Sequence, residues 1–177
     1  SAGGFQRLGA IDADFPSTAN AVSADGAVVT GSSGVSVRIG NSLESRTRAF
    51  RWTQNGGLQN LGVLPGHEYS AATIASADGS VVVGISSTGP IDRNGVGGRF
   101  RHAVSAANSR AFYWTQQTGM QDLNTMLVAA GVNLAGGTLV SATGISADGK
   151  WIGGGVVTPA SAPNTSKPAF ASLTQTP

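Results

Sequence analysis

The side chains best suited to chemistry in this 177-residue chain are guanidinium, imidazole and phenol groups gathered in a few stretches. Guanidinium groups bind carboxylates and phosphates through two parallel hydrogen bonds, so their clustering favours recognition of an anionic ligand. The competing interpretation is that these arginines only keep a weakly charged chain in solution, since charged residues make up 11% of it. The candidate binding residues are Arg38, Arg46, Arg48, His67, Tyr69, Arg93, Arg99, Arg101, His102 and Arg110.

Residues with the spacing needed for catalysis are sparse. The chain has two histidines and no cysteine, so disulfides, thiol catalysis and cysteine-ligated zinc are excluded. Glu68 follows His67, but adjacent residues in an extended segment point apart, and no nucleophile-elbow motif accompanies them. The pair Asp12 and Asp14 lacks the glycine and glutamate of a calcium loop. We therefore expect no catalytic residues, metal or cofactor, with a secreted hydrolase as the alternative function.

The overall composition indicates a turn-rich β protein. The chain contains 26 glycines, 40% apolar residues and a net charge of only +2, a balance that permits a packed core and does not predict a nucleic-acid partner. No apolar run reaches the roughly 18 residues that a membrane helix needs. The small residues Ser1–Gly4 are of the kind left after leader cleavage, so we expect an extracellular or cell-surface location.

Three sequence markers recur along the chain, as expected of a repeat architecture. Ser23–Gly26, Ser76–Gly79 and Ser146–Gly149 all spell Ser-Ala-Asp-Gly and precede an apolar run with a glycine. The other two markers are Ala49–Gln54 with Ala111–Gln116 and, more loosely, Ala169–Thr174, and Gly57–Gly62 with Gly119–Asn124 and Gly4–Gly9.

Each marker predicts a strand or a turn. Asp-Gly between apolar stretches favours a two-residue hairpin, because glycine adopts positive φ without steric cost. The alternating aromatic residues place two rings on one face of a strand, and we expect at least one ring per repeat to be buried. These rings belong to Phe50, Trp52, Phe112, Trp114 and Phe170. The repeat is thus predicted to be a four-stranded antiparallel sheet.

The order of the markers predicts one repetitive β domain, 1–177, of three propeller-blade-like repeats: 10–62, 63–124, and 125–177 completed by 1–9. The segment Gly4–Gly9 matches two internal fourth strands, while the last repeat lacks one, so we expect it to pair beside the strand containing Ala169 and Phe170. Three blades are too few for a propeller. We therefore expect a homodimer that forms one six-bladed ring, with a β-trefoil-like threefold monomer as the alternative.

In such blades the longer connections gather on one face, opposite the short Asp-Gly turns, and rigidly held loops commonly bind ligands. Val35–Arg48 and Ser87–Arg110 are predicted to be long loops on this face, beside the link Val63–Tyr69. Between the last two repeats, Leu123–Val132 is predicted to form a helix that Asn124 caps and Gly131 ends.

These motifs resemble the HAF-type extracellular repeats found in passenger regions of Gram-negative autotransporters. The resemblance is carried by Ser-Ala-Asp-Gly-x-Val-Val-x-Gly and by Arg-Ala-Phe-Arg-Trp-Thr-x-x-Gly-Gly-Leu-Gln-x-Leu-Gly, and it covers nearly the whole chain. It implies secretion or surface display and supplies no catalytic residues. Together with the arginines, it leads us to expect a binding or scaffold module for an anionic glycan or lipid headgroup.

Overall fold

Eleven strands and one short helix make up the described part of the chain in this computed structural model, which covers residues 4–91, 107–158 and 167–172. The first sheet contains β1 (Ser17–Val22), β2 (Val28–Ile39), β3 (Ser42–Thr53) and β4 (Gly57–Asn60). The second contains β5 (Tyr69–Ala75), β6 (Val81–Ser87), β7 (Ser109–Thr115) and β8 (Gly119–Asp122). The helix α1 (Leu123–Ala129) leads to the third, which contains β9 (Thr138–Ile145), β10 (Trp151–Val157) and β11 (Lys167–Ser172).

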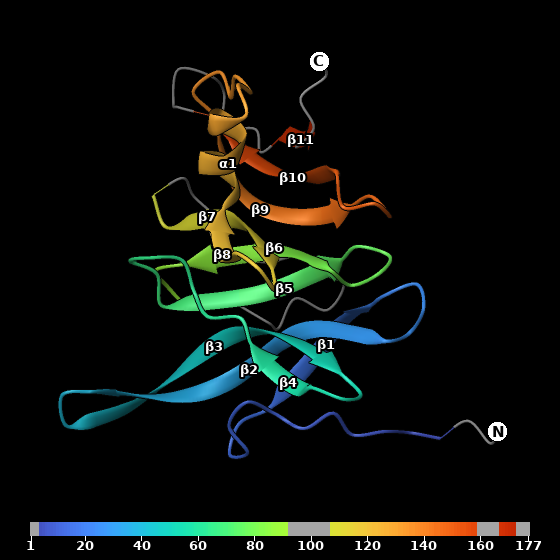
Figure 1. Cartoon of the computed structure of the whole chain (residues 1–177). Helices are drawn as coiled ribbons and strands as arrows, with labels where there is room; N and C mark the ends of the chain where they lie inside the picture. Colours follow the sequence, from blue (N-terminus) through green and yellow to red (C-terminus); the bar gives the residue numbers. More distant parts are fainter. Residues whose placement is uncertain (1–3, 92–106, 159–166, 173–177) are drawn as a thin grey trace.

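The three sheets are antiparallel and lie one above another (Figure 1). Strand order is β1-β2-β3-β4, then β5-β6-β7-β8, then β11-β10-β9. The predicted all-β class with four-stranded antiparallel sheets is confirmed. The described residues of one chain form an open stack rather than a closed ring or barrel.

Of the three apolar clusters in the described residues, the two larger ones form layers between neighbouring sheets. Alternate residues of β6 point to opposite faces of its sheet. Val82 therefore packs with Phe112 and Trp114 towards the first sheet, while Val81 and Val83 pack towards the third. The second layer also contains Leu123, Leu127, Leu139 and Ile152, so α1 is part of the core.

The Asp-Gly turns have the same hydrogen bonds in all three sheets. In the first, the Ser23 hydroxyl donates to Asp25 Oδ1 at 2.5 Å and accepts the Val28 N–H at 2.9 Å, while Gly26 has a φ of 73°. The strands end at Val22 and resume at Val28, so the predicted two-residue hairpin is wrong. The serine and aspartate side chains satisfy the backbone of a longer turn.

These turns also connect the sheets to one another. The N–H of Ala24 donates to the carbonyl of Ala77 at 3.0 Å, and the N–H of Ala77 donates to that of Ala147 at 3.0 Å. The three turns consequently lie above one another on the right of Figure 1. Two residues at strand bulges make a second series, in which Asn20 Nδ2 donates to Ala72 O at 2.7 Å and Thr73 Oγ1 donates to Ala142 O at 2.5 Å.

The predicted aromatic core is confirmed in the first two sheets. Phe50 and Trp52 on β3, and Phe112 and Trp114 on β7, are all buried. Phe170 lies on β11, and its side chain falls outside the described residues. The backbone of β11 pairs one residue out of step, since Gly154 faces Ala169 whereas Gly31 faces Phe50.

Three sequence expectations differ from the structure. Residues 4–10 are not a strand, and they lie below the first sheet, at the far end of the stack from β11 (Figure 1). In the described residues this segment therefore does not make the predicted pairing with β11.

The second difference is at Val35–Arg48, which is not a loop. β2 and β3 pair continuously to Ile39 and Ser42, and the hairpin projects beyond the other sheets. The third concerns the helix, which Asp122 caps by accepting the Asn124 N–H at 2.8 Å. The Asn124 side chain instead binds both backbone groups of Leu139, at 2.7 and 2.9 Å.

Candidate functional site

Arg46 is the most completely bound of the predicted site residues, and it joins β3 to the start of β5. The side chain is buried, and its Nη1 donates to Glu44 Oε2 at 2.6 Å and to the Tyr69 hydroxyl at 2.8 Å. Its Nη2 lies 3.3 Å from Glu68 Oε2, and the guanidinium stacks 5.0 Å from the centre of the Tyr69 ring. Two carboxylates thus neutralise a cation that also fastens the first two sheets together.

Arg48 lies next to this cluster and holds the link that leads into β5. Its Nη1 donates to the carbonyl oxygen of Glu68 and, at 3.1 Å, to that of Thr47. The Glu68 N–H in turn donates to Ser87 O at 2.9 Å. The structure therefore brings Arg46, Arg48 and Tyr69 together, in a cluster that positions the link.

A hollow of about 650 Å³ lies where this link approaches the helix. It is open to solvent, and it combines an imidazole, a guanidinium and a carboxylate with apolar and thioether side chains, a mixture typical of small-ligand sites. Its lining residues are Leu64, Pro65, His67, Arg110, Met120, Gln121, Asp122, Thr125, Met126 and Ala129. Two of the predicted site residues, His67 and Arg110, thus share one site.

The imidazole of His67 is oriented by Ser86. His67 Nδ1 lies 3.0 Å from Ser86 Oγ, which donates its own proton to Tyr69 O at 3.1 Å. The serine oxygen is therefore left to accept from the Nδ1–H of His67, which leaves Nε2 as an acceptor. Burial lowers the pKa of His67 below its ordinary value, and the positive charge of Arg110 acts in the same direction.

Ser86 serves the scaffold rather than acting as a nucleophile. Its side chain is fully buried, and its oxygen also accepts the N–H of Leu64 at 3.2 Å. Ser33 does the same in the first sheet, where it accepts the N–H of Ile11 at 2.9 Å without a histidine beside it. The contact between His67 and Ser86 therefore fixes the ring and the tautomer.

Arg110 and Asp122 form the charged part of the hollow. Arg110 Nε lies 3.9 Å from Asp122 Oδ2, and its Nη1 donates to Ser109 O at 2.8 Å. Both side chains are partly exposed. A separation of 3.9 Å is long for a charge-assisted hydrogen bond, so the interaction between these two side chains is weak.

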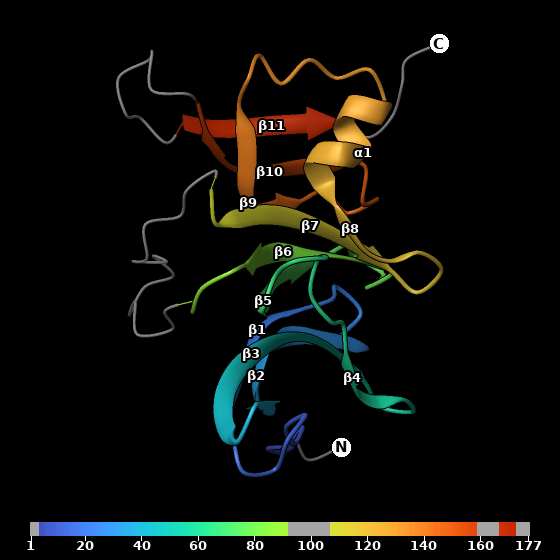
Figure 2. The same ribbon diagram turned by 90° about the vertical axis from the view of Figure 1, so that its left-hand side faces the viewer.

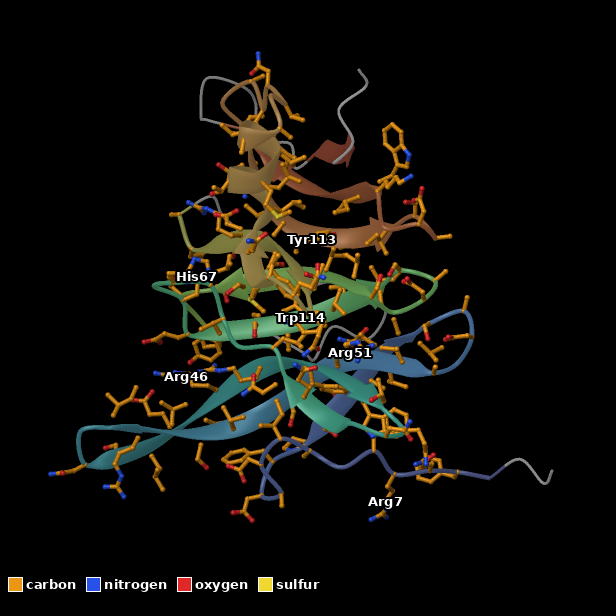
Figure 3. All side chains as sticks on the ribbon, in the orientation of Figure 1. Arg7, Arg46, Arg51, His67, Tyr113 and Trp114 are labelled. Carbon is orange, nitrogen blue, oxygen red and sulfur yellow. The ribbon has the colours of Figure 1, made fainter. Side chains whose placement is uncertain are left out.

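The hollow and the hairpin lie on the same side of the stack. Figure 2 looks onto this side, with the β2–β3 hairpin, the link after β4 and α1 at successive heights. Figure 3 places His67 and Arg46 there, and Arg7 far from both. The Asp-Gly turns occupy the opposite side, an arrangement that agrees with the one expected from strand count.

The remaining predicted site residues fall in two groups. Arg38 is exposed near the tip of the hairpin. Arg93, Arg99, Arg101 and His102 lie outside the described residues.

Of the aspartates considered for catalysis, Asp12 is an anchor, since its Oδ2 accepts from the Ser36 N–H at 3.0 Å and the Ser36 hydroxyl at 2.8 Å.

Sequence reasoning missed Asp122, Met120 and Met126, which line the hollow. The sequence gives one signal for them: the fourth strand of the second repeat runs directly into a helical segment. All three residues lie close to this junction. Only the packing of α1 against β7 and β8 turns this junction into the wall of a site.

The described ranges contain no helix long and apolar enough to cross a membrane. Within the same ranges, no group of three or more histidine, aspartate or glutamate side chains is placed to hold a metal ion. Comparisons of the chain with protein-family models, curated proteins and solved structures find no match.

Proposed function

We propose that this protein is a binding module of the cell surface or extracellular space, with propeller-type blades that present the hollow beside α1 to an anionic glycan or lipid headgroup. The observation that carries the proposal is the pairing of His67 and Arg110 beside the apolar side chains of Leu64, Met120 and Met126. Sugars and lipid headgroups offer both the negative groups and the apolar surface that such a site fits.

The electrostatics of the hollow support a ligand with one or a few negative charges. Arg46 and Arg48 are occupied by Glu44, Glu68 and backbone carbonyls, so they contribute little to an anion-binding surface. Arg110 is partly exposed at the hollow, and its Nε lies 3.9 Å from the carboxylate of Asp122. Recognition of a discrete acidic group is therefore favoured over a broad polyanion-binding face.

The proposal is tested by titrating the protein with heparin, lipopolysaccharide and acidic oligosaccharides at low and high salt. Arg110→Ala should weaken binding about 10–100-fold, the loss expected when one charged hydrogen-bonding contact is removed. Arg7→Ala, which removes the same charge from an exposed position far from the hollow, is the matched control and should bind normally. Because exposed charges are screened, added salt should weaken binding by the wild type.

The dependence of binding on pH gives a second readout. His67 is neutral at pH 7, since its pKa lies below the ordinary value of 6.5. A bound anion stabilises the protonated ring, so binding should strengthen as the pH falls through and below 6.5, and His67→Gln should abolish this increase. Absence of saturable binding to all three ligand classes at low salt contradicts the proposal.

A further inference from the structure

The β2–β3 hairpin is longer than the corresponding part of the second sheet. When the two sheets are aligned on their glycine–phenylalanine pairs, the β6–β7 ladder ends at Ser87 and Ser109, the positions of Gly34 and Thr47 in the first sheet. The β2–β3 ladder continues for five further pairs, to Ile39 (Figure 1). At about 3.3 Å per residue, these pairs extend the hairpin by about 16 Å past its neighbour.

This extra length leaves the tip of the hairpin in solvent. A sheet of the length of β6–β7, stacked on either face, would leave most of the five pairs uncovered. Burial along β2 follows this limit, since Val35 is buried, Val37 is partly buried and Ile39 is 43% exposed. On β3, Leu43 is 68% exposed. The tip thus carries two large apolar side chains that a stacked sheet of the same kind does not reach.

The two apolar side chains lie on opposite faces of the hairpin. Directly paired residues of an antiparallel ladder share a face, and successive residues alternate between faces. Ile39 pairs with Ser42 and lies on the same face as Arg46, which bonds to β5 of the second sheet. Leu43 pairs with Arg38 on the other face. A partner that packs flat against one face therefore covers one apolar side chain and leaves the other in water.

The charge at the tip is positive. Arg38 is the one charged side chain between residues 35 and 43, and it is exposed. Glu44, the next charged residue, accepts from Arg46 at 2.6 Å and is neutralised there. An arginine lays its methylene groups along apolar surface while its guanidinium stays at the level of polar groups. Apolar side chains beside a cation match the surface of a membrane that contains anionic lipids.

The hairpin holds its tip in a defined conformation. Gly40 and Asn41 connect β2 to β3, and Gly40 has a φ of 58°, which glycine readily supplies at the first position of a two-residue turn. Nearer the body of the protein, Asp12 accepts from the N–H and the hydroxyl of Ser36, and Arg46 bonds to β5. Because the hairpin is ordered before it meets a partner, binding costs little conformational entropy.

We propose that the tip of the β2–β3 hairpin inserts into the interface of a bilayer that contains anionic lipids. A lipid interface surrounds the tip and buries Ile39 and Leu43 on both faces at once, while Arg38 lies at the level of the phosphates. Insertion is shallow, because backbone groups at the outer edges of the hairpin need water. The tip is separate from the hollow, and the proposal does not rest on a ligand there, although both lie on one side of the stack (Figure 2).

Flotation with vesicles tests the apolar part of the contact. The wild type should bind vesicles of phosphatidylcholine and phosphatidylglycerol, and bind phosphatidylcholine alone more weakly. Leu43→Ser should lower the partition coefficient about 10-fold, whereas Leu43→Phe should retain binding. Val22→Ser is the matched control, because it removes a side chain that is 61% exposed beside an Asp-Gly turn on the opposite side of the stack. It should bind as the wild type does, and equal binding by Leu43→Ser overturns the proposal.

The cationic part of the contact has its own test. Arg38→Ala should weaken binding to the vesicles that contain phosphatidylglycerol about 5-fold, and Arg38→Lys should keep most of it. Neither variant should change binding to phosphatidylcholine alone. Both positions are exposed, so circular dichroism spectra of the Leu43 and Arg38 variants should match the wild type. Binding by Arg38→Ala that is equal to wild type on anionic vesicles overturns the assigned role of the guanidinium.

A fluorescent label separates insertion of the tip from binding elsewhere. The chain has no cysteine, so Asn41→Cys can carry one polarity-sensitive dye at the tip. Its emission should shift to the blue on anionic vesicles, while the same dye at Asn55→Cys, in the exposed turn at the other end of β3, should not respond. Vesicle binding with an unresponsive tip dye, the result expected if only the hollow holds a headgroup, overturns the proposal. A hairpin that serves a protein partner would leave the wild type unbound to vesicles, which also overturns it.

Discussion

Gly84 on β6 faces Phe112 on β7, and a Cβ built at this glycine would lie 2.8 Å from the phenyl ring and 2.1 Å from the carbonyl oxygen of Ala71. The same geometry recurs at Gly31 with Phe50 and Thr18. In each of the first two sheets the phenyl ring therefore lies over a strand glycine. Its packing there requires that this residue carry no side chain.

We expect Gly84→Ala to lower the free energy of unfolding by about 1–3 kcal/mol, because the Phe112 ring and the backbone of Ala71 would both have to move. Urea denaturation measures this change. Gly144→Ala is the matched control, since it lies in a strand with ordinary φ and its Cβ would meet nothing within 4 Å. The control should leave stability within about 0.5 kcal/mol. Equal stability of the two variants would refute the packing argument.

Removal of the Arg46 guanidinium should loosen the junction of the first two sheets. Arg46→Ala deletes bonds to Glu44 and Tyr69 and a stacking contact, so we expect a loss of about 1.5–3 kcal/mol in urea denaturation. Arg46→Lys should recover only part of this loss, since an ammonium lacks the planar fork.

Arg38→Ala provides the matched control, because it removes the same charge from an exposed position on the same hairpin. It should change stability by less than about 0.5 kcal/mol. If Arg46→Ala is as stable as Arg38→Ala, the cluster does not hold the sheets together.

The features predictable from sequence are those set by local chemistry. The glycine of each Ser-Ala-Asp-Gly turn acts through its φ preference and is found as expected in all three sheets. The period-two aromatic residues act through strand alternation and are buried as expected in the first two sheets. The hairpin over Val35–Arg48 was missed, although Val35, Val37 and Ile39 alternate with polar residues and Gly40 has a φ of 58° at the turn. Backbone pairing along its whole length holds the hairpin, together with the bonds of Ser36 to Asp12 and of Arg46 to Tyr69.

The candidate site depends on tertiary contacts and was only partly predictable. His67 and Arg110 were identified as binding candidates by type, but their shared hollow is created by α1 and Asp122. Asn124 was expected to cap the helix, and it is instead occupied by Leu139 of the following strand, a partner that no local pattern specifies.

That double contact gives a further prediction. Asn124→Ala removes both partners of the Leu139 backbone groups, so unfolding should become easier by about 1–3 kcal/mol, the cost of unsatisfied buried polar groups. Protection of the Leu139 amide from hydrogen exchange should fall with it. Val128→Ala on the exposed face of α1 should leave both quantities near the wild type, and an unchanged Leu139 amide in Asn124→Ala would contradict the assignment.

The turn carboxylate of Asp78 should make the fold sensitive to acid. The Ser80 N–H, followed by the hydroxyls of Ser76 and Ser80, lowers its pKa to about 2. Since the ordinary value is 3.8, the folded state holds the carboxylate in its charged form more strongly than the unfolded state does. The contribution to stability is therefore fully present above pH 3.8 and is lost as the pH falls towards 2. Asp78→Asn should be less stable than the wild type at pH 7, with the difference shrinking between pH 4 and 2 in urea denaturation, whereas Asp14→Asn, at an exposed carboxylate, should behave like the wild type throughout. A difference between Asp78→Asn and the wild type that stays constant down to pH 2 would show that the charge of Asp78 does not contribute to the turn.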